Sequence, residues 1–309
     1  MPSLEEVHSI IAIYGPTIFF HPDEIYFPSS VAWFFKNGAL LYKRGSSTPE
    51  AIAEDGSNLP QGGGADEEYW IDLPTDSAKA EMMRRGDLES AEVYIHVKSV
   101  LGGTFTDVVM WVFYPFNGPA TLQLLGAVSL PLSKIGEHVG DWEHVTLRID
   151  NFRGELWGIY FSQHSGGQWV KAGDLEYVEG SKKAVVYSSK SGHAMFSRAG
   201  LVVQGNQKLG MAGIASYSEK SAYFVDTSTK YKIVGAEYLK GMESSEKVAE
   251  PVWLNYARKW GPKITYPISK VRGYIDLPRQ VLGEDGPAGP KWKRDWYEDE
   301  NVEELLQSY

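Results

Sequence analysis

The stretch GEHVGDWEHVTLRID, residues 136 to 150, has five ionisable side chains in its first nine positions and then alternates between apolar and polar residues. A period of two is typical of a β-strand whose faces meet different surroundings. A strand that begins near Asp141 places the carboxylates of Asp141 and Glu143 on one face. The same face carries the apolar residues Val145, Leu147 and Ile149. Trp142 and His144 then belong to the opposite face.

Two carboxylates on one face of a half-buried strand repel each other when both are ionised. A proton, a bound cation or a basic side chain from a distant segment can relieve this repulsion. His138 can reach the same point, because Gly140 lets the chain turn. Oxygen donors favour a divalent cation such as Mg²⁺ or Ca²⁺, with Zn²⁺ more suitable if His164 or His193 joins. We expect Asp141→Asn to weaken such a site and to leave the fold mostly intact.

The bulk composition describes a globular chain with its own core. Of the 309 residues, 43% are hydrophobic and 23% are charged, and cysteine is absent. The net charge of −10 argues against a general nucleic-acid binder, since phosphate neutralisation needs clustered Lys and Arg. The start MPSLEEVHSIIAIYGP lacks a basic segment followed by an apolar one, so we expect no signal peptide. No apolar run reaches the ~20 residues of a transmembrane segment. We expect a cytoplasmic protein that can associate with a membrane surface.

Short runs of β-forming residues between turn residues predict a mainly β fold. We expect an antiparallel two-sheet β-sandwich with short peripheral helices, as a single domain over residues 1–309. Strands are predicted at 93–97, 108–114, 146–149, 155–163, 184–188, 201–204, 222–225 and 232–236, and helices at 3–14, 76–85, 252–260 and 301–307. Residues 17–35, TIFFHPDEIYFPSSVAWFF, favour strand, turn, strand. Composition favours a flexible loop at residues 45–68 and a C-terminal extension at residues 280–309.

Two further histidines lie beside glycines at strand ends. His164 stands in SQHSGGQW, residues 162 to 169, and His193 stands in SSKSGHAMF, residues 188 to 196. Both are candidates for ligand binding at one end of the sandwich, although a glycine turn with an exposed histidine is the simpler interpretation. The sequence contains none of the common nucleophile, phosphate-loop or zinc-protease motifs.

Over most of its length the chain resembles the vacuolar protein sorting-associated protein 62 family, in its plant form of unassigned function. The motifs that carry the resemblance occur in the family's order. They are YGPTIFFHPDEIYFPSSVAWFF, YPFNGP, GEHVGDWEHVTLRI, YFSQHSGG, VVYSSKSGHA and WGPKI.

Its central third is also distantly similar to the necrosis- and ethylene-inducing cytolysins, a β-sandwich family that binds a divalent metal and glycosylated sphingolipid heads. That resemblance implies metal ligation by His138, Asp141 and Glu143. The cytolysins' earlier aspartate falls on Asn117, whose neutral amide implies weaker cation binding. The insertion ATLQLLGAVSLPLSKI between the motifs YPFNGP and GEHVGDWEHVTLRI is a second departure from the cytolysins. A shared fold alone does not imply that this chain is toxic.

These observations predict metal-assisted binding of a glycan or of a glycosylated lipid head group on a membrane surface. A membrane-active or defence role, cytolytic or insecticidal in type, would follow from such binding. Trp142 or Trp169 could stack on a sugar ring, whereas Trp111 lies in an apolar run that favours core filling. Two alternatives stay open: a metal-dependent hydrolase with His138 or His164 as base, and a vacuolar sorting scaffold without a small ligand.

Overall fold

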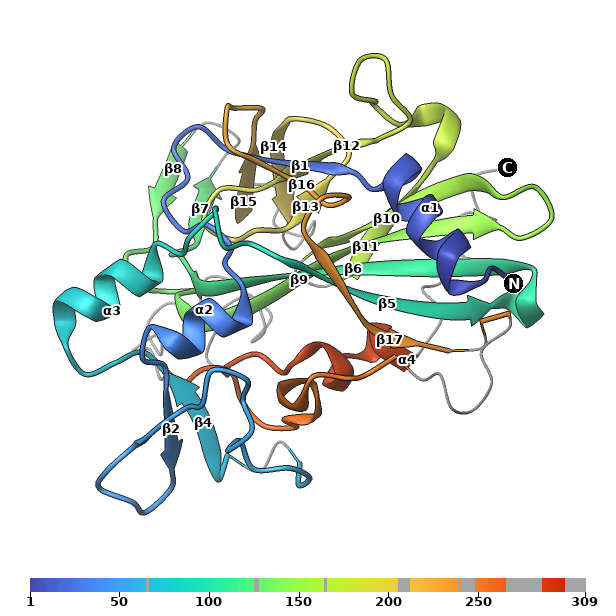
Figure 1. The fold of residues 1–309 in the computed structure, drawn as a ribbon. Coiled ribbons are helices and arrows are strands. Elements are labelled where there is room, and N and C mark those ends of the chain that lie inside the picture. The colour runs from blue at the N-terminus through green and yellow to red at the C-terminus, as the bar shows by residue number, and fades with distance from the viewer. Residues whose placement is uncertain are drawn as a thin grey trace.

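The computed structural model describes residues 1–64, 67–124, 128–163, 166–204, 212–237, 239–240, 248–264 and 285–297. Within these ranges the protein is mainly β, with short helices at the periphery (Figure 1). Its largest unit is a six-stranded sheet with the order β11-β10-β9-β6-β5-β17. In chain order these strands are β5 (Val93–Val100), β6 (Phe105–Asn117), β9 (His138–Asp150), β10 (Glu155–Gln163), β11 (Gly166–Lys171) and β17 (Tyr231–Ala236).

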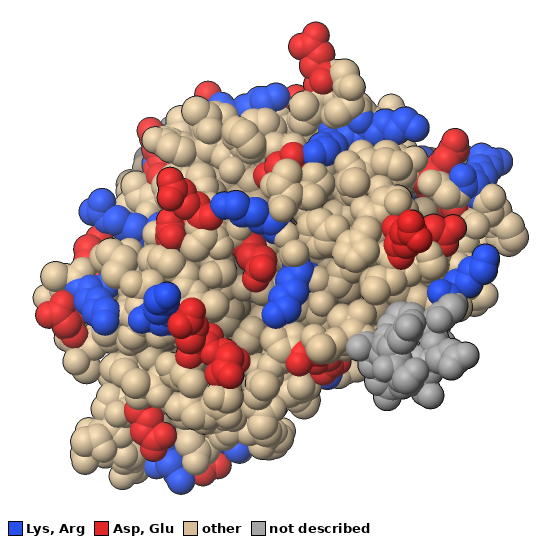
Figure 2. Space-filling view, in the orientation of Figure 1, with Lys and Arg blue, Asp and Glu red and all other residues tan. Residues whose placement is uncertain are grey.

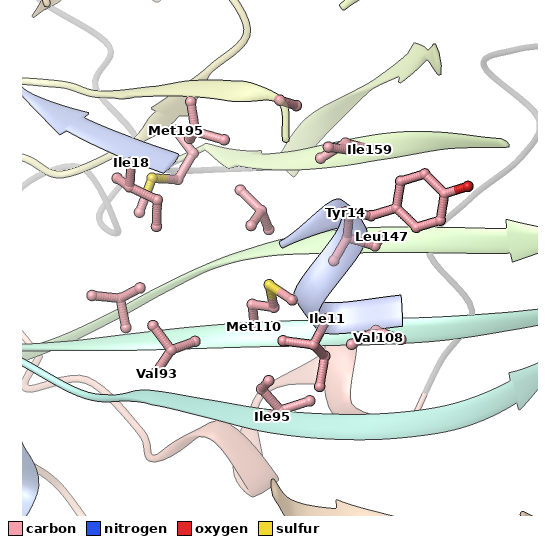
Figure 3. Packing of buried hydrophobic residues seen from close by; sticks show 14 of the residues in the cluster. Ile11, Tyr14, Ile18, Val93, Ile95, Val108, Met110, Leu147, Ile159 and Met195 are labelled. Carbon is pink, nitrogen blue, oxygen red and sulfur yellow. The ribbon is translucent and has the colours of Figure 1, made fainter. Parts of the chain in front are cut away.

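A four-stranded sheet with the order β13-β12-β1-β16 packs on one face of the six-stranded sheet. Its strands are β1 (Thr17–Phe20), β12 (Val185–Ser188), β13 (Met195–Phe196) and β16 (Phe224–Asp226). Figure 3 shows Ile18 and Met195 on one side of the shared core and Val93 and Ile95 on the other. The core also takes in Ile11 of helix α1 (Leu4–Tyr14). Two sheets around one apolar core confirm the predicted sandwich.

The alternation predicted for β9 is confirmed. Val145, Leu147 and Ile149 are buried in the core between the two sheets, whereas Trp142 is buried on the opposite face. The strand extends further back than the apolar alternation indicates, to His138. Strand β10 has the predicted bounds.

Two strand pairs are parallel, which differs from the expected antiparallel arrangement. Strand β1 pairs in parallel with β12, and β5 pairs in parallel with β17. The partners lie far apart in the sequence, so the connections are long enough for parallel pairing. The sandwich is therefore built from mixed sheets.

A second apolar cluster covers the other face of the six-stranded sheet. It includes side chains from helices α2 (Val31–Lys36) and α3 (Ser77–Arg84), from the small sheet β3-β2-β4, and from the 3-10 helix η4 (Val252–Asn255). The small sheet consists of β2 (Leu40–Lys43), β3 (Glu50–Ala51) and β4 (Tyr69–Asp72). The second strand expected within residues 17–35 is wrong, because α2 forms there. The Ser30 hydroxyl caps this helix by accepting from the Trp33 amide at 3.0 Å.

The segment 45–68, expected to be a flexible loop, contributes to this second cluster. It contains β3, and the side chains of Ile52 and Leu59 are 6% and 2% exposed. Gly56 lies directly against Trp253, since a Cβ on Gly56 would lie 2.8 Å from the Trp253 Cβ. Only part of the segment is therefore surface chain.

A fourth sheet, with the order β14-β15-β7-β8, follows the end of β6. It contains β7 (Thr121–Leu124), β8 (Val128–Pro131), β14 (Gly200–Gln204) and β15 (Ala212–Ser218). Figure 1 places it at the end of the sandwich opposite the N-terminus of the chain. It forms one wall of the cavity described below.

The predicted helices have mixed outcomes. Helix α1 forms within the predicted residues 3–14, where Ser3 and Glu6 make a capping box, and α3 forms within the predicted residues 76–85, where Asp76 is the N-cap. The helix expected at residues 252–260 is wrong beyond η4, because Lys259 makes strand-like bridges on both sides. The helix predicted at residues 301–307 lies outside the described residues.

The predicted C-terminal extension is described over residues 285–297. It contains the 3-10 helix η7 (Pro290–Trp292) and helix α4 (Arg294–Tyr297). Acidic and basic side chains intermingle on the face shown in Figure 2, so the net charge of −10 forms no single acidic patch there. In the part of the chain that the structure describes, no helix is long and apolar enough to cross a membrane.

Candidate functional site

A cavity of about 950 Å³ lies at the end of the sandwich where β6 ends and β9 begins. Its walls come from the ends of β6 and β9, from the sheet with β7 and β15, from the turn after β12, and from the C-terminal segment. All four residues expected to ligate a metal line this cavity: Asn117, His138, Asp141 and Glu143. The pairing of Asn117 with His138 across β6 and β9 brings the two motifs together.

The backbone at the start of β9 turns at Gly140. This residue has φ +66°, in the left-handed region that favours glycine. The turn allows Nδ1 of His138 to lie 2.7 Å from the Gly140 carbonyl oxygen. Because a carbonyl oxygen only accepts, Nδ1 donates, and Nε2 is left as an acceptor when the ring is neutral. Burial lowers the pKa of His138, which favours that neutral form.

Asp141 is held by His193, which lies in the turn after β12. The His193 Nδ1 lies 3.0 Å from the Asp141 Oδ2, and its Nε2 lies 3.1 Å from the Tyr26 carbonyl oxygen. Both partners are acceptors, so both ring nitrogens donate and His193 is an imidazolium cation. The ring stacks on Tyr114, with 3.8 Å between centroids. His193 is fully buried and does not line the cavity.

The charges of this pair support each other. Burial by itself would lower the pKa of His193, but the hydrogen bond with Asp141 and the negative charge of Glu24 raise it. Burial would likewise raise the pKa of Asp141, but the hydrogen bond from His193 and nearby positive charge lower it to about 2. Asp141 is therefore an ionised carboxylate at the cavity wall.

Glu143 has the opposite behaviour. Burial and the negative charge of Asp141 raise the pKa of Glu143 to about 7. The Ser162 hydroxyl donates to Glu143 Oε2 at 2.6 Å and accepts from the His144 amide at 3.0 Å. Near neutral pH, Glu143 is present both as an acid and as a carboxylate.

Lys293 supplies a cation beside these acids. The pairing of β10 with β9 ends where Phe161 lies opposite Val145, so the Trp142 carbonyl lies beyond the end of that ladder. The Lys293 ammonium donates to this carbonyl and also lines the cavity. Its positive charge favours the ionised forms of both neighbouring acids. The basic run KWKR at residues 291–294, in an acidic chain, is the sequence signal that could have identified this residue.

Two glycines bring the C-terminal segment to this position. A Cβ on Gly261 would lie 2.2 Å from the Val139 carbonyl oxygen, and a Cβ on Gly286 would lie 1.9 Å from the Gly261 carbonyl oxygen. Real Cβ atoms do not approach backbone oxygens so closely, so only glycine permits this packing. The packing holds residues 285–297 against the start of β9 and places Lys293 at the cavity.

Among the described residues, the other side chains predicted to bind a ligand do not line the cavity. Trp142 is fully buried in the second cluster. The Arg148 guanidinium lies over the ring of Trp169, 4.3 Å from the ring centroid. The stacking role expected for these two tryptophans does not agree with where they lie. Trp111 fills the core, as its apolar run indicates. His164 lies outside the described residues.

The side chains predicted to ligate a metal have suitable donor atoms, but these atoms do not lie close enough together to hold a cation. His138 and the carboxyl groups of Asp141 and Glu143 offer the nitrogen and oxygen donors that divalent cations take. Within the described ranges, however, no three His, Cys, Asp or Glu side chains converge closely enough to hold an ion. Positive charge reaches the acids from His193 and Lys293 instead. No step in ligand binding is therefore assigned to a cation.

Comparison with known proteins places the chain in a family. A family model described as "Vacuolar protein sorting-associated protein 62" matches residues 1–300. The chain belongs to the Vps62 family. A Vps62 relative from Saccharomyces cerevisiae is 26% identical over 216 residues, which cover 62% of this chain and 42% of the relative. The match thus spans less than half the length of that Vps62 protein.

Several solved structures are similar to part of this chain. "NLPPya in complex with glucosamine" is 15% identical, covers 64% of this chain and 72% of that chain, and has a TM-score of 0.36. "Necrosis and Ethylene inducing Protein 2" from the causal agent of cocoa's Witches Broom disease is 12% identical, covers 69% and 79%, and has a TM-score of 0.29.

Proposed function

We propose that the cavity binds a hydroxyl-rich ligand, namely a glycan or the glycosylated head group of a membrane lipid. The observation that carries the proposal is the pair of buried acids at the cavity wall, which differ in protonation. Asp141, with its pKa lowered to about 2, accepts hydrogen bonds. Glu143, with its pKa raised to about 7, can donate or accept near neutral pH. Adjacent sugar hydroxyls, each a donor and an acceptor, match such a pair.

Other groups in the cavity extend this complementarity. The His138 Nε2 offers an acceptor, and the ammonium of Lys293 offers donors. A volume of about 950 Å³ lies within the range of small-molecule sites. Binding of a glycosylated lipid would bring the protein to a membrane surface. A membrane-active or defence role, cytolytic or insecticidal in type, is the biological extension of this proposal.

A divalent cation is a separate part of the proposal. The oxygen donors of Asn117, Asp141 and Glu143 favour Mg²⁺ or Ca²⁺ over Zn²⁺. The Asn117 Nδ2 donates to the carbonyl oxygens of Gly118 and Gly136, which leaves its Oδ1 as the acceptor. These side chains would have to close around an ion, because they do not converge as they stand. Elemental analysis of purified protein and titration with each metal alone test this part.

The test of ligand binding uses Glu143→Gln, which keeps the size of the side chain and removes its acid. Glu155→Gln, at the exposed start of β10, is the matched control. On an array of defined glycans, and with vesicles containing glycosylated sphingolipid, Glu143→Gln should weaken binding by roughly 10- to 100-fold, since a hydrogen bond to a charged group contributes about 1.5–3 kcal/mol. The control should bind like the wild type. If the wild type binds neither glycans nor these vesicles, the proposal is wrong.

A hydrolase is the second candidate, favoured by the pKa of Glu143. A carboxyl group with a pKa near 7, beside an ionised carboxylate, suits proton transfer to a leaving group. This candidate would be supported if the wild type released product from aryl glycosides or esters and Glu143→Gln did not. A loss of this turnover on chelation would show that it depends on a metal. Without turnover or ligand binding, the sorting scaffold becomes the better interpretation, and capture of a protein partner would test it.

A further inference from the structure

A second, smaller cavity adjoins the one described above. It has a volume of about 220 Å³ and shares Lys259, Asp285 and Gly286 with the larger cavity. Its other lining residues include Trp70 of β4. The two cavities therefore share a border formed by residue 259 and residues 285–286. A ligand of more than one unit that crossed this border would occupy both cavities.

Trp70 is held in a fixed orientation by its neighbours. It lies opposite Tyr42 of β2 in the antiparallel register, and the two rings are stacked with 5.6 Å between centroids and 10° between planes. On its other side, Trp70 forms a parallel bridge with Lys259. Ile71 points to the opposite side and is buried in the second cluster, so Trp70 belongs to the outer face of the small sheet. A fixed aromatic ring on an outer face is available to a ligand.

Charged side chains surround this ring at the second cavity. The Glu67 carboxylate accepts from Arg44 at 2.9 Å and from Lys263 at 2.7 Å, and Lys263 lies 3.5 Å from Asp285. All four residues line the cavity. These ion pairs are exposed enough for their remaining donors and acceptors to bond hydroxyl groups of a ligand. An aromatic face with polar groups around it suits a sugar ring, whose C–H face is apolar and whose edge carries hydroxyls.

We propose that the second cavity is a subsite for a further sugar unit, so that the preferred ligand is an oligosaccharide. One unit lies at Asp141 and Glu143, and a neighbouring unit stacks on Trp70. This inference rests on the proposed function and adds the class of ligand to it. Trp70 is then a residue that determines ligand length, and Lys259 and Asp285 border both units.

The experiment measures affinity as a function of ligand length. Glucose, cellobiose and cellotriose, and glucosamine with its β1–4 dimer and trimer, are titrated into the wild type and Trp70→Ala by calorimetry. Phe152→Ala is the matched control, because Phe152 is 85% exposed and lines neither cavity. Trp70→Leu keeps apolar contact with Tyr42 but removes the flat ring, and it serves if Trp70→Ala lowers stability.

Wild-type affinity should rise about tenfold from monosaccharide to trisaccharide in at least one series, in line with one aromatic stacking contact. Both Trp70 variants should lose this gain while their monosaccharide affinity stays within about twofold of the wild type. Phe152→Ala should keep the gain. Equal binding of all lengths by the wild type, or a gain that survives both Trp70 variants, overturns the subsite and leaves the larger cavity in place. If no saccharide of either series binds the wild type, the subsite proposal is wrong, and the glycan array and the vesicles decide separately on the proposed function.

Discussion

Asp141 and His193 form a buried ion pair, with 3.0 Å between Oδ2 and Nδ1. The second ring nitrogen of His193 donates to the Tyr26 carbonyl, so the imidazolium joins β9 to the chain after β1. Glu24, which precedes Tyr26 by two residues, also accepts from the Ser191 amide of the same turn at 2.7 Å. The carboxylate that faces the cavity is therefore also part of the support of the fold.

Asp141→Asn should destabilise the protein by about 3–5 kcal/mol, because it leaves a buried imidazolium without its anion. From the sequence alone we expect the fold to stay mostly intact, so the two predictions differ in the size of this loss. Urea unfolding of the wild type and the variant measures the difference in the free energy of unfolding. Glu143→Gln, whose parent side chain is partly protonated at neutral pH, should cost far less and is the better probe of binding.

A double-mutant cycle isolates the pair. His193 has φ +58°, so His193→Asn is the suitable substitution, since asparagine tolerates the left-handed region. The coupling free energy between Asp141→Asn and His193→Asn should exceed about 1 kcal/mol. Simple additivity of the two costs would contradict the ion pair.

Chelation tests the cation. If Mg²⁺ or Ca²⁺ is bound, wild-type protein should melt at a lower temperature after EDTA treatment, and the metal should restore it. A ligand at about 100 times its Kd stabilises by roughly 2.7 kcal/mol, which calorimetry detects easily. Glu143→Gln should respond less. An unchanged melting temperature together with substoichiometric metal would contradict the cation. The positive charges of His193 and Lys293 would then be what neutralises the acids.

Leu59→Ala should lower the free energy of unfolding by about 2–4 kcal/mol, because it opens a hole in the second cluster. Leu59 is 2% exposed although it lies within the segment 45–68, whose composition favours a loop. Phe152→Ala removes a larger side chain at the surface and should change stability by less than about 0.5 kcal/mol. Equal, small effects of both substitutions would restore the interpretation of a loop that the core does not need.

His96 should reduce stability as the pH falls. It is buried and stacks on Trp296 with 3.8 Å between centroids, and burial lowers its pKa in the folded protein. Below a pH of about 6.5, His96 is protonated in the unfolded chain but stays neutral in the folded protein. The free energy of unfolding therefore decreases as the pH falls, until the pH reaches the lower pKa of the folded protein. His96→Phe keeps a ring against Trp296 and cannot titrate. It should lose less stability than the wild type between pH 7.5 and 5.5, as measured by urea unfolding.

Gly286→Ala should displace the C-terminal segment, since the new Cβ would collide with the Gly261 carbonyl. Loss of Lys293 from the cavity should weaken glycan binding at least as much as Glu143→Gln does. Gly173→Ala, at a glycine with open space around it, is the control and should bind normally. Normal binding by Gly286→Ala would show that the segment is not needed for the site.

The period of two in residues 145–149 identified the core strand and both of its faces, because alternation reports burial directly. It also placed Asp141 and Glu143 together on one side. The pairing of Asp141 with His193 and the arrival of Lys293 depend on contacts between distant segments, which no local pattern encodes. Residues 31–36 were misread because VAWFF has the composition of a strand, whereas the Ser30 cap and packing on the sheet decide for a helix.

The glycine contacts hold residues 285–297 against β9. Through them the C-terminal segment adds one wall of the cavity, but it adds no strand to the two packed sheets. Every strand of the two packed sheets is complete by Ala236, so a chain emerging from the ribosome can close its sandwich while the Lys293 side of the cavity is still unsynthesised. The C-terminal segment then acts as a closing piece. A chain that ends before residue 285 would contain every strand of the two packed sheets and would still lack the Lys293 side of its cavity.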